Sequence, residues 1–436
     1  MRILRYYVIP AVLASLFSAG CNGEDPAGEG LFSDAELEKV KLHSPLPPLK
    51  PDTTNMYADN ENAAALGQRF FFEKGYSGPI VVGDDGMNGG LGAVGETGKV
   101  SCRSCHLGDF MIDTRSQPNG TSLAIDWFFR NSPTLLNVAT YDTQFGWVGF
   151  NDNLWGKNLI PAEFVMGTNR SDIVKFIYSK YKDEYNAVFS PPLDDTLLDE
   201  MRFPKGATPL NPMSAWMTMA EGDRDIINRA YSNFGKAIQA YERKLVTGEA
   251  PFDRFVAGDQ AAISESAKRG LKLFIGKAAC SECHSGPTFS DEKFHVTGVP
   301  QIGEHVPPAD EGRFAAIDVY LGWDFNTAGK YNDDPSINRT TGVTKDEKLT
   351  GAFRTKGLRN IAGTGPYMHT GHMTTLTEVV EFYNEGGATS GYAGTKSTFM
   401  KPLNLSDEEI ADIVAFLETL TGAPVPAELF EDTAGP

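Results

Sequence analysis

Two short motifs of cysteine and histidine constrain this chain more than any other feature of its sequence. Both have the pattern Cys-x-x-Cys-His, and they consist of Cys102, Cys105 and His106 and of Cys280, Cys283 and His284. Two thiols at this spacing can reach both vinyl groups of a haem, and the adjacent imidazole can bind the iron. The motifs therefore predict two covalently attached haem c groups and a fold that encloses both.

The other cysteine chemistries fit the sequence less well. A Cys-x-x-Cys pair can also form half of a zinc site or a redox-active pair. The chain has five cysteines, of which the motifs use four and Cys21 is the fifth. A zinc site built from the four motif cysteines remains an alternative, but it would leave both motif histidines without a role.

The N-terminus has the features of an export signal. Arg2 and Arg5 precede a short apolar run over residues 8–17, and small residues follow directly before Cys21. This run is shorter than the ~20 residues that a membrane-spanning helix needs. Residues 1–20 therefore predict a signal peptide of the lipoprotein type, with a lipid anchor at Cys21 and a periplasmic location. An ordinary secretory signal is the alternative.

The charge balance excludes some partners. The chain has 39 basic and 57 acidic residues, for a net charge of −18. This charge would repel the phosphates that dominate nucleic-acid binding, so no nucleic-acid partner is expected.

Apolar periodicity and capping residues predict a mainly α fold. We expect helices over residues 63–72, 227–245 and 264–275, and another one opened by Ser406 and Glu409. After a tether and a short helix over residues 21–44, the chain divides into two halves, 45–250 and 251–436, with one motif each. Residues 301–348 are mostly polar and predict a long insertion outside the core.

The distribution of histidines makes the two motifs unequal. The chain has seven histidines, and none lies between His106 and His284. The first iron would therefore lack a local histidine as its sixth ligand. An open coordination position suits a haem that reacts with peroxide, whereas a protein ligand on each side suits an electron carrier.

Several stretches, together with the two motifs, resemble the bacterial di-haem cytochrome c peroxidase and MauG superfamily. These stretches are residues 130–137 (Arg-Asn-Ser-Pro-Thr-Leu-Leu-Asn), 240–245, 251–254, 358–361 and 366–371. The resemblance extends from about residue 45 to about residue 420. It implies two cytochrome c-like helical domains, with a peroxide-binding haem in 45–250 and an electron-relay haem in 251–436.

The resemblance also implies roles for residues near the first haem. Trp147 matches the tryptophan that relays electrons between the haems, and a buried core aromatic is its alternative. Pro161 matches the proline of the distal pocket. Glu163 is the only residue that fits the distal acid–base glutamate, with an exposed glutamate at a helix start as the alternative. Lys157 occupies a position where the family often has glutamine.

Further ligands follow from the same resemblance. Asn131, Thr364 and Pro366 match the family's calcium ligands, one side chain and two backbone carbonyls. Tyr383 takes the position of the sixth ligand of the second haem, which is methionine in the peroxidases and tyrosine in MauG. The alternatives for this ligand are Met368 and Met373.

These residues predict an enzyme that reduces hydrogen peroxide with electrons from a small periplasmic donor, a cytochrome c or a cupredoxin. The first alternative is a MauG-like, peroxide-dependent oxidation of residues on a partner protein. A plain electron-transfer cytochrome, with both irons six-coordinate, is an alternative from another class.

Overall fold

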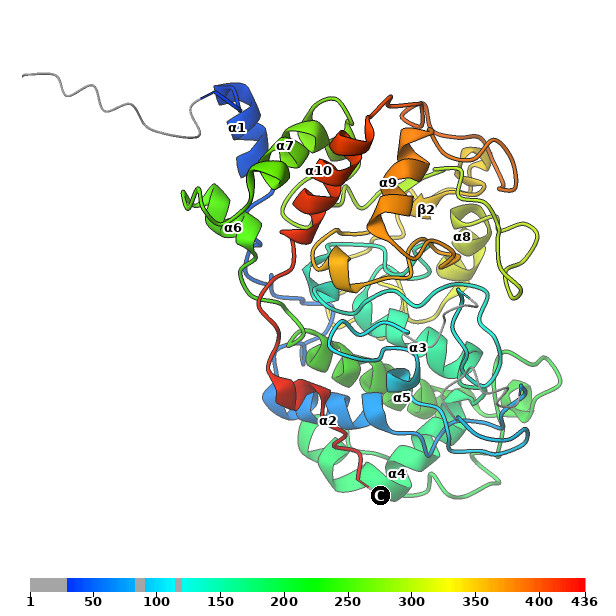
Figure 1. Cartoon of the computed structure of the whole chain (residues 1–436). Helices are drawn as coiled ribbons and strands as arrows, with labels where there is room; N and C mark the ends of the chain where they lie inside the picture. Colours follow the sequence, from blue (N-terminus) through cyan, green and yellow to red (C-terminus); the bar gives the residue numbers. More distant parts are fainter. Residues whose placement is uncertain (1–29, 83–90, 114–119, 436) are drawn as a thin grey trace, which may run out of the picture.

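The computed structural model describes residues 30–82, 91–113 and 120–435 (Figure 1). The predicted signal peptide, Cys21 and most of the predicted tether lie outside these residues. The α-helices of the described chain are α1 Asp34–Lys41, α2 Glu61–Phe72, α3 Leu154–Phe164, α4 Arg170–Val188, α5 Glu221–Glu242, α6 Pro251–Val256, α7 Glu265–Ile275, α8 Arg313–Gly322, α9 Leu376–Asn384 and α10 Asp407–Glu418. The prediction of a mainly α fold is confirmed.

Strands are scarce in the described ranges. Phe294–His295 (β1) and Phe353–Arg354 (β2) form one antiparallel two-stranded sheet, in which Phe294 pairs with Arg354. Short 3₁₀ turns complete the regular structure, and two of them, Cys102–Ser104 and Cys280–Glu282, carry the Cys-x-x-Cys-His motifs. None of the helices in the described ranges combines the length and the apolar character needed to cross a membrane.

The first half of the chain is organised by a close crossing of α2 and α5. A Cβ atom at Gly67 would lie only 1.9 Å from the carbonyl oxygen of Ala237, so only glycine allows the two backbones to approach this far. The predicted apolar stripe of α5 is fully buried at this crossing and in the core around it. Helices α3 and α4 pack against α5 and complete the first hydrophobic core.

The second half repeats this arrangement with α7 and α10. A Cβ atom at Gly270 would lie 1.9 Å from the carbonyl oxygen of Asp412. Ser264, the first residue of the predicted helix, caps α7, and Ser406 forms the predicted capping box with Glu409 at the start of α10. Figure 1 shows the α7 and α10 pair in the upper part of the molecule and the α2 and α5 pair in the lower part.

Helix boundaries differ from the sequence prediction mainly at α5. This helix begins at Glu221 and ends at Glu242, three residues before the predicted end. Leu245 stays buried, but its amide donates to the carbonyl of Glu242 in a tighter turn (3.0 Å). The apolar stripe therefore continues past the last helical residue, and periodicity alone could not locate the helix end.

The expectation that residues 301–348 lie outside the core is wrong. Tyr320 and Phe325 are completely buried, and Phe325 belongs to the first hydrophobic core. The hydroxyl of Tyr320 donates to Asp152 (2.9 Å), and Lys236 on α5 pairs with Asp333 (2.6 Å). Some polar residues of this segment thus face the first half of the molecule and find partners there, while many others are exposed.

Two other segments leave their own half of the chain. Val40 on α1 packs in the second core, although it precedes the first motif in the sequence. The C-terminal segment runs from α10 to the region of α2 (Figure 1), and the carbonyl of Leu429 accepts a hydrogen bond from Tyr241 (2.6 Å). Segments from both ends of the chain therefore tie the two halves together.

The position of Phe325 allows a test of whether the inserted segment is part of the first hydrophobic core. Its ring contacts Trp155 and Tyr231 in the first core, with ring centroids 6.5 and 5.6 Å apart. We expect Phe325→Ala to lower the free energy of unfolding by about 3–5 kcal/mol, because it leaves a cavity in a packed core. Leu321→Ala, at a side chain that is 42% exposed, should change it by less than about 0.5 kcal/mol. Thermal unfolding of the haem-loaded protein by circular dichroism measures both, and equal stability of the two variants would contradict this packing.

Candidate functional site

The two Cys-x-x-Cys-His motifs have the same local structure. In each motif the second cysteine and the histidine donate their amides to the carbonyl of the first cysteine, at 3.2 Å and 3.2 Å from Cys105 and His106 and at 3.3 Å and 2.9 Å from Cys283 and His284. The four motif cysteines form no disulfide. They also do not gather into one metal-binding group, so the alternative of a four-cysteine zinc site is wrong for the described residues.

Both motif histidines are oriented by the residue five positions later. Nδ1 of His106 lies 3.1 Å from the carbonyl of Met111, and Nδ1 of His284 lies 2.9 Å from the carbonyl of Phe289. Because Nδ1 donates to a carbonyl, Nε2 keeps its lone pair for a metal. Burial lowers the pKa of His106 to about 4 and also lowers that of His284, which keeps both rings in the neutral, metal-binding form.

One cavity of about 600 Å³ joins the two motifs. Its wall contains cations, among them the buried Arg354 and the half-buried Lys157 and Lys356. Lys157 and Lys356 form no ion pair with a described residue, and burial holds the pKa of Lys356 well below its usual range. Buried cations need anionic partners. A haem brings two carboxylate-bearing propionates, so the charge and the donor set of this cavity fit a haem c group at each motif.

Trp147 lies where the two halves of the molecule meet in this cavity. Its indole N–H donates to the carbonyl of Asn131 in the first half (2.7 Å). The ammonium of Lys356 in the second half lies 4.9 Å from the ring centroid of Trp147, and the amide of Arg354 donates to its backbone carbonyl (2.8 Å). The residue predicted to lie between the haems therefore contacts both halves.

Helix α3 places Lys157 and Pro161 on the cavity wall, but not Glu163. Lys157 and Pro161 are four positions apart and share one face of the helix, and Val165 continues that face. Glu163 is two positions from Pro161, which turns its side chain about 200° around the helix axis. There its carboxylate makes a bidentate ion pair with Arg170 (2.9 and 2.9 Å). The prediction that Glu163 faces the first motif is therefore wrong.

A different carboxylate lines this part of the cavity. Glu242, in the last turn of α5, accepts a hydrogen bond from the side chain of Asn158 on α3 (2.6 Å), and both residues line the cavity. Glu242 lies in the stretch 240–245 that carries the family resemblance, but the resemblance implies no role for it. One signal could have found it, because Glu242 follows Ile238 by four positions and Ile238 also lines the cavity.

Two of the three predicted calcium ligands, Asn131 and Pro366, come together from distant parts of the sequence. Asn131, Thr364 and Pro366 all line the cavity, and the side-chain amide of Asn131 lies 2.6 Å from the carbonyl of Pro366. The other end of this amide, Oδ1, is buried without a hydrogen-bond partner. Rotating the amide by 180° would place Oδ1 beside the carbonyl of Pro366, so an oxygen-binding cation fits these residues.

Tyr383 on α9 lines the cavity near the second motif. Burial, reinforced by the nearby sulfur atoms of Cys283 and Cys280, raises the pKa of its phenol, and its hydroxyl makes no hydrogen bond to a described residue. Of the two methionine alternatives, Met368 also lines the cavity, whereas Met373 is buried in the second core and does not.

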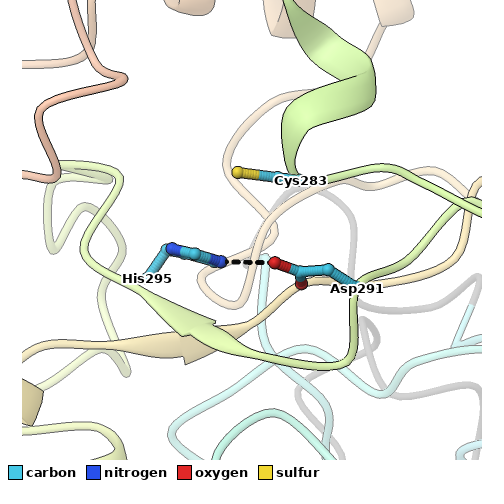
Figure 2. A group of neighbouring side chains, drawn as sticks. All are labelled: Cys283, Asp291 and His295. Atoms are coloured by element: carbon cyan, nitrogen blue, oxygen red, sulfur yellow. Dashed lines mark hydrogen bonds and ion pairs between the residues drawn. The ribbon is translucent and has the colours of Figure 1, made fainter.

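A second polar group lies beside the second motif. Figure 2 shows Cys283, Asp291 and His295 grouped together, with Nε2 of His295 2.8 Å from the carboxylate of Asp291. Their potential metal-binding atoms lie within 4.8 Å of one another. A thioether bond to haem would occupy the sulfur of Cys283, so the arrangement fits a His–Asp pair beside a haem better than a separate metal site.

Comparisons with known proteins agree with this geometry. The family model described as di-haem cytochrome c peroxidase matches residues 61–261. The cytochrome-c peroxidase IdrP1 of Denitromonas iodatirespirans is 34% identical over 390 residues, which cover 86% of this chain and 85% of the relative. The chain belongs to the di-haem cytochrome c peroxidase family. It is an oxidoreductase of the peroxidase type.

The family also includes proteins with other names. The methylamine utilization protein MauG of Methylorubrum extorquens is 31% identical over 337 residues, which cover 76% of each chain. Among solved structures, a MauG-like protein associated with microbial copper homeostasis has a TM-score of 0.58 at 24% identity and covers 90% of this chain and 97% of its own. The di-haem peroxidase BthA of Burkholderia thailandensis has a TM-score of 0.57 at 19% identity, over 89% of this chain and 94% of its own. These structures share the fold of the present chain.

Proposed function

We propose that this protein reduces hydrogen peroxide with electrons from a small periplasmic donor, either a cytochrome c or a cupredoxin. The observation that carries the proposal is the contrast between the two ends of the cavity. Near the first motif the wall has the polar side chains of Lys157, Asn158 and Glu242. Near the second motif Tyr383 lines the wall beside aliphatic side chains of the second core. The first end therefore has hydrogen-bonding groups for a small polar substrate, and at the second end Tyr383 would take the sixth position on the iron.

The chain's own residues have distinct roles in this proposal. Haem c, attached at both motifs through the four cysteines, would supply the iron that binds peroxide and the path for electrons. His106 and His284 would bind the two irons through Nε2, and Lys356 and Arg354 would neutralise propionates. Lys157 would donate a hydrogen bond to peroxide, Asn158 donates to the carboxylate of Glu242, and Pro161 would limit the width of this part of the cavity. Trp147 would relay electrons between the haems.

A MauG-like reaction is the second candidate, and Tyr383 is the observation that favours it. A tyrosinate is a hard anionic ligand, which favours ferric iron and lowers the reduction potential of the haem. A second haem bound this way would store oxidising equivalents rather than collect electrons from a high-potential donor. Oxidation of residues on a partner protein would then replace turnover of a small electron donor.

Calcium is proposed as a further ligand, bound by Asn131, Thr364 and Pro366. The unpaired Oδ1 of Asn131 and the adjacent carbonyl of Pro366 support this assignment. The backbone carbonyl of Asn131 holds the indole of Trp147. A cation on the side chain of Asn131 would therefore also fix the position of Trp147. Export and a lipid anchor at Cys21 remain proposals from the sequence, and they agree with a periplasmic donor.

Electron-spin resonance of the ferric protein, followed by addition of peroxide, tests the proposed function. We expect one high-spin signal that peroxide consumes, and subsequent turnover of reduced cytochrome c or reduced cupredoxin. Reaction with peroxide but no turnover of either donor would favour the MauG-like reaction. Two low-spin haems that do not react with peroxide would contradict both and indicate a plain electron-transfer cytochrome.

The axial ligand of the second haem can be tested separately. We expect Tyr383→Phe to change the optical and electron-spin resonance spectra of one haem and to raise its reduction potential, because a hard anionic donor is lost. Met368→Leu is the matched variant on the same cavity wall and should leave both spectra unchanged. The opposite result would assign the ligand to methionine.

If Asn131 binds calcium, removal of its side-chain oxygen should lower the affinity of the protein for calcium. We expect Asn131→Ala to weaken calcium binding at least about tenfold, or about 1.4 kcal/mol, as measured by calorimetric titration of the haem-loaded protein after chelation. Asn338→Ala, at an exposed asparagine, is the control and should bind like the wild type. Equal affinities of the two variants would place any calcium elsewhere.

A further inference from the structure

Glu242 is the only carboxylate among the described residues that line the cavity. It is 2% exposed and comes from the last turn of α5, one helical turn after Ile238, which lines the same wall. A buried carboxylate without an ion-pair partner is costly, and most carboxylates in this protein avoid that cost at the surface or through an arginine or lysine. Glu242 is neither exposed nor paired with an arginine or a lysine among the described residues.

Hydrogen bonding fixes the direction of this carboxylate. The side-chain amide of Asn158 donates to Oε2 of Glu242 (2.6 Å). Asn158 is adjacent to Lys157 on α3, the helix that also places Pro161 on the wall. The carboxylate therefore lies beside the polar part of the wall near the first motif, where the proposed function places peroxide.

No other described carboxylate can take this position. Glu163 is held by Arg170 through two hydrogen bonds to its guanidinium and one to its backbone amide, and Arg170 also binds Asn228. The side chain of Glu163 is completely inaccessible. Turning it toward the cavity would remove the bidentate partner of the buried guanidinium of Arg170 and leave only the more distant carboxylate of Asp324 (3.7 Å), which is costly.

We propose that Glu242, held by Asn158, is the catalytic carboxylate that transfers a proton between the two oxygens of hydrogen peroxide. This inference rests on the proposed peroxidase function. The ionised carboxylate would take the proton from one oxygen of hydrogen peroxide, and its protonated form would give this proton to the other, far oxygen. The oxygen–oxygen bond breaks, and the far oxygen leaves as water instead of hydroxide. The complete reaction, H₂O₂ + 2 H⁺ + 2 e⁻ → 2 H₂O, takes its electrons from the donor named above.

The electrostatic environment of Glu242 suits both steps. Burial raises its pKa to about 7, against the opposing effects of the hydrogen bond from Asn158 and of the charge of Lys157. Both forms are then populated near neutral pH, which is the condition for efficient proton transfer in both directions. Lys157 on α3 is the charged group that faces Glu242. The sulfur of Cys102, also nearby, would be uncharged as a thioether.

Rapid mixing of the haem-loaded protein with peroxide measures the rate constant of their reaction and so tests whether Glu242 is catalytic. Glu242→Gln keeps the shape and accepts the hydrogen bond of Asn158 but cannot transfer the proton, so its rate constant should fall roughly 100-fold or more. Glu242→Asp should retain part of the rate. Glu249→Gln, at an exposed glutamate of the following loop, is the control and should react like the wild type. Glu163→Gln should lower thermal stability but leave the rate constant of the folded protein unchanged.

Two measurements separate a proton-transfer role from a structural one. The wild-type rate constant should rise with pH through the pKa of Glu242 near 7, because the ionised form takes the first proton, and Glu242→Gln should remove this dependence. Lys157→Gln should move the midpoint upward, because a positive neighbour is lost. Infrared titration of the ferric protein without peroxide should show a protonated carboxyl band with the same midpoint, and Glu242→Gln should lack it.

The outcomes distinguish this inference from the proposed function. A wild-type protein that does not react with peroxide would contradict the proposed function itself. A reactive wild type with an equally reactive Glu242→Gln variant would overturn only the role of Glu242. Loss of reactivity in Glu163→Gln with retention in Glu242→Gln would return that role to Glu163.

Discussion

Each half of this protein depends on one close contact between two helix backbones. Gly67 allows α2 to meet α5, and Gly270 allows α7 to meet α10, at distances that any side chain would prevent. In both halves the first helix of the pair leads toward a Cys-x-x-Cys-His motif, and the second returns to close the core. The crossing thus holds the motif at the edge of the core, beside a cavity that two haem c groups fit.

The two haem environments are similar in backbone and different in side chains. Each histidine is held by a carbonyl five residues later, and the residues that provide it, Met111 and Phe289, both have a left-handed backbone (φ of 50° and 54°). The walls then differ, because α3 brings Lys157 and Asn158 to one end and α9 brings Tyr383 to the other. A repeated scaffold with unequal walls can assign peroxide chemistry to one haem and electron transfer to the other.

The relative position of the two halves is itself part of the site. Trp147 contacts Asn131 in the first half and Lys356 in the second half. It can therefore bridge the two motifs only if the two halves keep a fixed relative position. The inserted segment provides this support through Phe325 in the first core and through the ion pair of Asp333 with Lys236. The segment 301–348, which the sequence predicts to be a polar insertion, connects the two halves in the folded molecule.

The sequence by itself determined the features that depend on local spacing. The motifs, the helix cap formed by Ser406 and Glu409, and the apolar stripe of α5 all follow from residues a few positions apart, and the structure confirms the cap and the stripe. The gathering of Asn131 with Pro366 followed from the family resemblance, because spacing cannot relate residues so distant in the chain.

Only the tertiary structure decided which carboxylate faces the cavity. The family resemblance points to Glu163 and implies no role for Glu242, but the rotation of α3 turns Glu163 to Arg170, and the approach of α5 to α3 brings Glu242 to Asn158. The burial of the inserted segment was decided in the same way, since its polar groups find partners only after the two halves meet. Helical periodicity gives the relative direction of side chains on one helix, whereas the packing of helices decides what each face meets.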